Sequence, residues 1–93
     1  MSITKKDIQF LKDLKKKIEN EQDKLNEEYA GLDKEIERLK SELTVNQYEH
    51  SPYVGDIESD ISTVLCKLDD NGEAWNCIDF IIDKLTELIT NEN

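Results

Sequence analysis

The sequence predicts an all-α protein, in which a long N-terminal coiled-coil helix is followed by a short C-terminal helical hairpin in a dimeric assembly. Residues 8–43 place apolar side chains in heptads, and residues 56–93 contain two further apolar stripes at helical spacing. Glycine and proline are scarce, with three and one among 93 residues, which argues against many short strands joined by tight turns.

The composition predicts a thin structure with one structural unit overall. Apolar residues and charged residues each make up 37% of the chain. This balance does not fill a large globular core, but it suits helices that each bury one face. We expect three segments: a heptad-repeat helix over 1–45, a linker over 46–55 and an acidic helical hairpin over 56–93.

The heptad-repeat helix is defined by an apolar seam, with Ile8 at position a and Leu11 at position d. The expected seam consists of Ile8, Leu11, Ile18, Leu25, Tyr29, Leu32, Ile36, Leu39 and Leu43. At a rise of 1.5 Å per residue, residues 8–43 span roughly 54 Å, which is longer than we expect the rest of the chain to cover. The seam therefore predicts pairing with a second helix, and a homodimer is the expected state. The flanking charges leave open whether the pair is parallel or antiparallel.

Three positions interrupt the seam without breaking its phase. Lys15 and Gln22 occupy a positions, where polar residues weaken a coiled coil but fix its register. Gly31 costs about 1 kcal/mol relative to alanine in a helix. Because the heptad phase continues from Tyr29 to Leu32, we expect one continuous helix.

The segment 46–55 loses the heptad pattern and contains the only proline and the only histidine. Pro52 disfavours a helix that runs through it and biases Ser51 towards an extended backbone. These features predict the linker.

The segment 56–93 contains one apolar stripe over residues 57–68 and a second, wider one over residues 73–90. Asp69-Asp70-Asn71-Gly72 lies between them and is typical of a turn. The wider stripe is expected if the last helix touches two neighbours. It contains Ala74, Ile78, Ile81, Ile82, Leu85, Leu88 and Ile89.

The net charge of −10 is concentrated in the second half of the chain. Residues 1–44 carry ten basic and eleven acidic residues, whereas residues 45–93 carry two and eleven. Direct binding to nucleic acid or to an anionic membrane is not expected, because both require a basic face. A basic protein partner is the natural counterpart. No apolar run or leader-like segment is apparent, so a cytoplasmic protein with reduced cysteines is expected.

No pattern indicates catalysis, a cofactor or a metal. If Gly72 is aligned with the glycine of a calcium loop, Lys67 and Ile78 fall at the first and last ligand positions, which require carboxylates. Cys66 and Cys77 are expected on helix faces that do not point at each other. His50 lies in the linker and has no pre-organised catalytic neighbours. We therefore expect no enzymatic activity.

The candidate partner-binding residues lie on the last helix, where Phe80 projects among the carboxylates of Asp79, Asp83 and Glu87. An exposed aromatic ringed by acids suits a basic partner. The alternative is that Phe80 packs against the first helix or a second subunit.

Two functional hypotheses follow. The first is a non-enzymatic coiled-coil interaction module, of adaptor, chaperone or inhibitor type, that self-associates through its seam and binds a basic protein. The alternative is an acidic DNA mimic, such as a phage-type anti-restriction or anti-defence inhibitor, that occupies the site of a nucleic-acid-binding protein. The nearly neutral residues 1–44 argue against mimicry. A purely architectural coiled coil is the remaining possibility.

Overall fold

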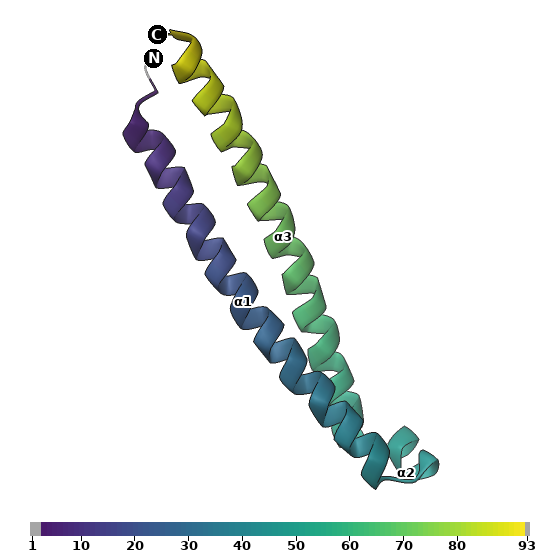
Figure 1. Cartoon of the computed structure of the whole chain (residues 1–93). Coiled ribbons are helices and arrows are strands. Elements are labelled where there is room, and N and C mark those ends of the chain that lie inside the picture. Colours follow the sequence, from purple (N-terminus) through teal and green to yellow (C-terminus); the bar gives the residue numbers. More distant parts are fainter. Residues whose placement is uncertain (1–2, 93) are drawn as a thin grey trace. The chain divides into compact units, whose positions relative to one another are not determined.

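The computed structural model describes residues 3–92, with side chains through residue 90, and its regular structure is entirely helical. Helix α1 spans Lys5–Glu42, α2 spans Val45–His50 and α3 spans Pro52–Glu92. Figure 1 shows α1 and α3 each as an unbroken helix. The predicted all-α class and the long N-terminal helix are thus confirmed.

The helices are divided between two compact units. The first unit combines α1 through Gln22 with α3 from Asp70 onwards, and the second contains residues 23–69. Each unit therefore contains part of α1 and part of α3, and each buries its own apolar side chains.

Helix α1 continues through Gly31, as the heptad phase predicts. At its start, the Asp7 carboxylate accepts hydrogen bonds from the backbone N–H and the hydroxyl of Thr4, at 2.8 and 3.2 Å, which satisfies a donor at the helix terminus. Every residue of the expected seam is buried or half-buried: Ile8, Leu11, Ile18, Leu25, Tyr29, Leu32, Ile36, Leu39 and Leu43.

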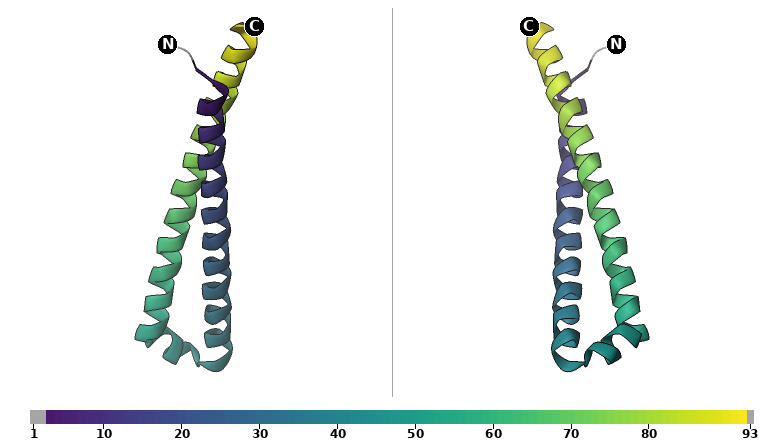
Figure 2. Two further views of the ribbon diagram at one scale, coloured as in Figure 1. Left: turned by 90° about the vertical axis from the view of Figure 1, so that its left-hand side faces the viewer. Right: turned by 90° about the vertical axis from the view of Figure 1, so that its right-hand side faces the viewer.

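The core of the second unit joins the seam of α1 to the start of α3. Ile36 and Leu39 pack with Val54 and Ile57, all buried. Half-buried apolar side chains extend this cluster: Leu32, Leu43, Tyr48 and Ile61. The chain reverses direction through α2, so the end of α1 and the start of α3 lie beside each other (Figure 2).

The segment expected as a linker is mostly helical, which corrects the prediction for 46–55. Thr44 and Gln47 form a reciprocal capping box that begins α2. Ser51 is extended, as expected before a proline. Pro52 then opens α3, because the first helical position needs no N–H donor, and the Ser51 hydroxyl accepts the Val54 N–H at 3.3 Å.

The expected C-terminal hairpin is also wrong, because α3 is one helix of 41 residues that continues through Asp69–Gly72. Asn, Asp and Gly each cost at most about 1 kcal/mol in a helix interior. The packing of α3 against α1 offsets that cost. In both units, the α3 residues that point towards α1 recur at alternating spacings of three and four, which keeps them on one face of a continuous helix. These positions are Val54, Ile57, Ile61, Val64, Leu68, Asn71, Trp75, Ile78, Ile82, Leu85 and Ile89.

Helix α1 is antiparallel to α3 within the first unit. Three residues along α1 show this order. Lys15 contacts Asp79, Glu19 contacts Trp75 and Gln22 contacts Asn71, so the residue numbers rise along α1 and fall along α3. The expectation that the remaining chain is too short to cover the seam is therefore wrong. In each unit, α3 of the same chain supplies the second helix that the seam requires.

Candidate interaction surface

The structure separates the four candidate partner-binding residues of α3. Asp79 turns towards α1, and its carboxylate lies 2.5 Å from the Lys15 ammonium with both side chains partly buried. Phe80, Asp83 and Glu87 are exposed. We call these last three residues the acidic-aromatic face. Asp79 belongs instead to the contact between α1 and α3 in the first unit.

Phe80 is the anchor of this face, and 62% of the residue is exposed. It therefore does not pack against α1, which was the alternative interpretation within one chain. The Lys84 ammonium lies 5.4 Å from the centre of the Phe80 ring and 3.9 Å from the Glu87 carboxylate. The ring thus accommodates a cation from its own helix.

A polar cluster lies on the inner edge of the first unit. The Lys15 ammonium sits 4.4 Å above the centre of the Trp75 ring, besides pairing with Asp79. The Trp75 indole N–H donates a hydrogen bond to the Glu19 carboxylate at 3.1 Å. Sequence reasoning identified Lys15 as a register device but missed its partners. The available signal was that Trp75 continues the heptad spacing of α3.

A second charged cluster lies in the second unit, where Glu35 pairs with Arg38 on the next turn of α1. Glu35 also accepts a hydrogen bond from the Tyr53 hydroxyl at 3.2 Å, and Arg38 lies 2.7 Å from Glu42. The hydrogen bond from Arg38, with a smaller contribution from Tyr53, lowers the pKa of Glu35 below its usual value. The carboxylates of Glu35 and Glu42 in turn raise the pKa of Arg38.

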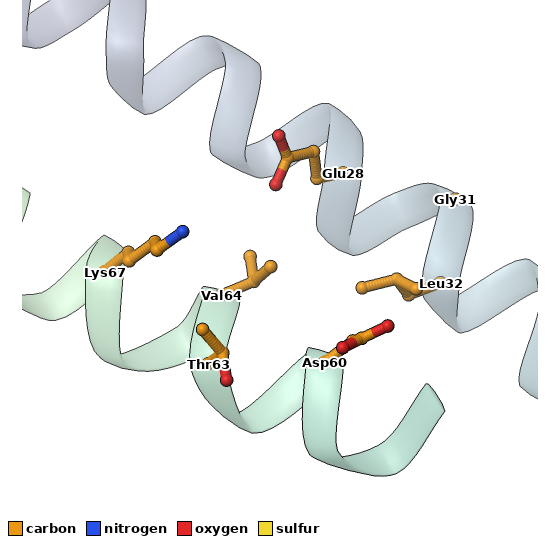
Figure 3. A pocket seen from close by; sticks show the side chains of 7 residues that line it. All are labelled: Glu28, Gly31, Leu32, Asp60, Thr63, Val64 and Lys67. Atoms are coloured by element: carbon orange, nitrogen blue, oxygen red, sulfur yellow. The ribbon is translucent and has the colours of Figure 1, made fainter. Parts of the chain in front are cut away.

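An open groove of about 500 Å³ lies between α1 and α3 in the second unit. Figure 3 shows Leu32 and Val64 projecting towards the space between the helices, where Gly31 contributes no side chain. The remaining lining residues are Glu28, Asp60, Thr63 and Lys67. Two carboxylates and one ammonium at an open groove do not form a desolvated catalytic site.

The other candidate chemical groups lie apart from one another. Cys66 and Cys77 are both free and exposed. A His50 ring nitrogen lies 2.9 Å from the carbonyl oxygen of Asn46 in α2. Within residues 3–92, no cluster of three or more His, Cys, Asp or Glu side chains is arranged to hold a metal ion. No helix in the same range is long and apolar enough to cross a bilayer.

No protein-family model matches this chain, and comparisons with curated proteins and with solved structures find no match.

Proposed function

We propose that this chain is a non-enzymatic helical interaction module, of adaptor, chaperone or inhibitor type, that binds a basic protein through Phe80, Asp83 and Glu87. The observation that carries the proposal is the exposure of Phe80 beside acidic residues on the outer side of α3. Aromatic anchors supply much of the free energy of many protein interfaces, and surrounding charges govern steering and partner choice.

The electrostatics of the first unit support a basic partner. Residues 70–92 contain six acidic residues and one lysine, a balance of −5. Residues 5–22 of α1 contain six lysines and four acidic residues, a balance of +2. The acidic charge is thus concentrated on α3, which is also the helix that presents Phe80.

The absence of catalysis is part of this proposal. Among the side chains that the structure describes, no polar or charged residue is buried. Catalytic groups usually need desolvation to change their reactivity, and partly or fully exposed groups lack it. A cytoplasmic location is also proposed, and the free thiols of Cys66 and Cys77 are compatible with a reducing compartment.

DNA mimicry is the second candidate, favoured by the excess of carboxylates in residues 45–93. Surface carboxylates can occupy phosphate positions in a nucleic-acid-binding protein. In the first unit, however, the Lys15 ammonium neutralises Asp79 and Lys84 approaches Glu87. These pairings interrupt a continuous row of negative charge, which is why protein binding is the preferred proposal.

A capture experiment with the full chain distinguishes the two functions. The chain is immobilised, proteins from a cell extract are bound, and retention is compared for wild type, Phe80→Ala and Asp83→Asn/Glu87→Gln. The matched control is Leu65→Ala, which removes another exposed apolar side chain from α3. The interaction-module hypothesis is supported if the captured partner is lost with Phe80→Ala but retained with Leu65→Ala. Binding of that partner to wild type should also persist at high salt.

A partner that is released by duplex DNA and lost steeply with salt supports mimicry instead, because such contacts imitate phosphates. Unchanged retention by Phe80→Ala and by the double charge variant would remove the acidic-aromatic face from both hypotheses.

A further inference from the structure

Helix α3 has a second apolar stripe in the first unit, beside the stripe that packs on α1. Ala74, Cys77, Ile81 and Leu88 recur at spacings of three, four and seven residues, so they share one face of the helix. All four are exposed, with Ile81 at 44% and Leu88 at 50%. This face accounts for the unusual width of the apolar pattern in the sequence, since only part of that pattern is buried against α1.

Helix α1 has its own exposed apolar pair in the same unit, Phe10 and Leu14, one helical turn apart. The salt bridge between Lys15 and Asp79 marks one side of the helix pair. Asp79 directly follows the core position Ile78 in the sequence. Leu14 and Ile81 instead directly precede core positions, which are Lys15 and Ile82.

In an antiparallel pair, residues that precede an a position on both helices flank the core on the same side. Leu14 and Ile81 precede Lys15 and Ile82, which occupy a positions of their respective helices. Both residues therefore lie on the side opposite Asp79. The exposed residues of α1 and α3 form one apolar patch, consisting of Phe10, Leu14, Ala74, Cys77, Ile81 and Leu88.

The two helices that form this patch carry opposite charge balances. Residues 5–22 of α1 have a balance of +2, whereas residues 70–92 of α3 have a balance of −5. Two copies related by a two-fold axis can therefore place the basic segment of α1 in one copy beside the acidic segment of α3 in the other.

We propose that a second copy of this chain binds the apolar patch, with α1 of each first unit against α3 of the other. Each α3 then contacts two copies of α1, one on each of its stripes. The apolar contact and the opposite charge balances of these two segments oppose the repulsion between chains that each carry a net charge of −10. The seam remains paired within the chain, so this interface is distinct from it and from the acidic-aromatic face.

The first test is solution mass by light scattering over a concentration series. We expect wild type to reach twice the 10.8 kDa of one chain. Ile81→Glu should halve this mass, whereas Leu65→Glu should not. The two side chains are matched, since both are 44% exposed on α3 and only Ile81 belongs to the patch. Circular dichroism checks that both variants stay helical.

The second test uses the two cysteines, because only Cys77 lies in the patch and both thiols are exposed in one chain. The rate of alkylation by iodoacetamide is measured for each thiol at low and high protein concentration. We expect Cys77 to become several-fold less reactive as the protein is concentrated, while Cys66 is unchanged.

A monomeric wild type, with Cys77 equally reactive at every concentration, would overturn the proposal and leave the patch to a different protein. A dimer that survives Ile81→Glu would overturn it as well, since the copies would then associate elsewhere. Neither outcome affects the acidic-aromatic face, whose test is lost retention with Phe80→Ala.

Discussion

The side-chain amide of Asn71 on α3 donates hydrogen bonds to the side-chain oxygen of Gln22 at 2.7 Å and to the backbone carbonyl of Ile18 at 2.9 Å. Asn71 and Gln22 are both polar residues at core positions of their helices, and they meet in the first unit. A shift of either helix by one heptad would place Val64 or Ile78 opposite the Gln22 amide in place of Asn71, which is unfavourable. This pair therefore specifies the register of α1 against α3.

Asn71→Ala is predicted to destabilise the protein by about 1–2 kcal/mol, because it removes two hydrogen bonds and leaves Gln22 without its partner. A double-mutant cycle with Gln22→Ala should give a coupling of roughly 0.5–1.5 kcal/mol. The measurement is urea unfolding followed by circular dichroism. The control is Asn76→Ala, since Asn76 is exposed on the same helix. Equal effects at Asn71 and Asn76 would show that the contact contributes nothing.

Lys15→Ala is predicted to lower the free energy of unfolding by about 1 kcal/mol, the sum of a partly buried ion pair and a contact with the Trp75 ring. Lys16→Ala is the control, because Lys16 is exposed and pairs only at 3.6 Å with Glu19. The fluorescence of Trp75, the sole tryptophan, should change with Lys15→Ala and not with Lys16→Ala. Identical spectra and stabilities would contradict this placement of Lys15.

The heptad pattern was sufficient to predict α1 as one continuous helix, because an apolar stripe with constant phase requires an unbroken helical backbone. It did not identify the helix that covers the seam. It was not sufficient for α3, where Asp69-Asp70-Asn71-Gly72 resembles a turn. Local propensity there favours a break by a few kcal/mol at most, and the heptad core of α3, to which Asn71 contributes two hydrogen bonds, outweighs it. The spacing of three and four residues from Leu68 through Asn71 to Trp75 already continued the heptad pattern across this segment and thus indicated a single helix.

The candidate surface was predicted in part. Exposure of Phe80 followed from its place opposite the apolar stripe, and the structure confirms that exposure. The role of Asp79 did not follow, because its partner Lys15 is 64 residues away along the chain. Once α3 was divided into two helices, the sequence offered no way to place those residues together.

Gly31→Ala and Gly72→Ala are each predicted to stabilise the protein by about 1 kcal/mol, since alanine is the better helix former. A Cβ atom at either position would meet nothing within 4 Å, so no clash offsets the gain. The melting temperature should rise by roughly 4–8 °C for each change, as expected for a domain of this size. A loss of stability with Gly31→Ala would show that the adjoining groove requires the absence of a side chain at this position.

Arg38→Gln is predicted to raise the pKa of Glu35 towards its usual value, because the hydrogen bond from Arg38 is the main cause of its lowering. Tyr53→Phe should produce a smaller rise. The pKa is measured by NMR titration of the Glu35 side-chain carbon. Lys40→Gln is the control, because Lys40 approaches Glu37 rather than Glu35.

The sign of the stability effect follows from linkage. The folded-state pKa of Glu35 lies below the unfolded value, so its contribution is present above the unfolded pKa and is lost as the pH falls through the folded pKa. Below pH 4.5, stability should therefore fall more steeply in wild type than in Arg38→Gln. Parallel acid-unfolding curves, together with an unmoved Glu35 resonance, would show that Arg38 does not hold this carboxylate in solution.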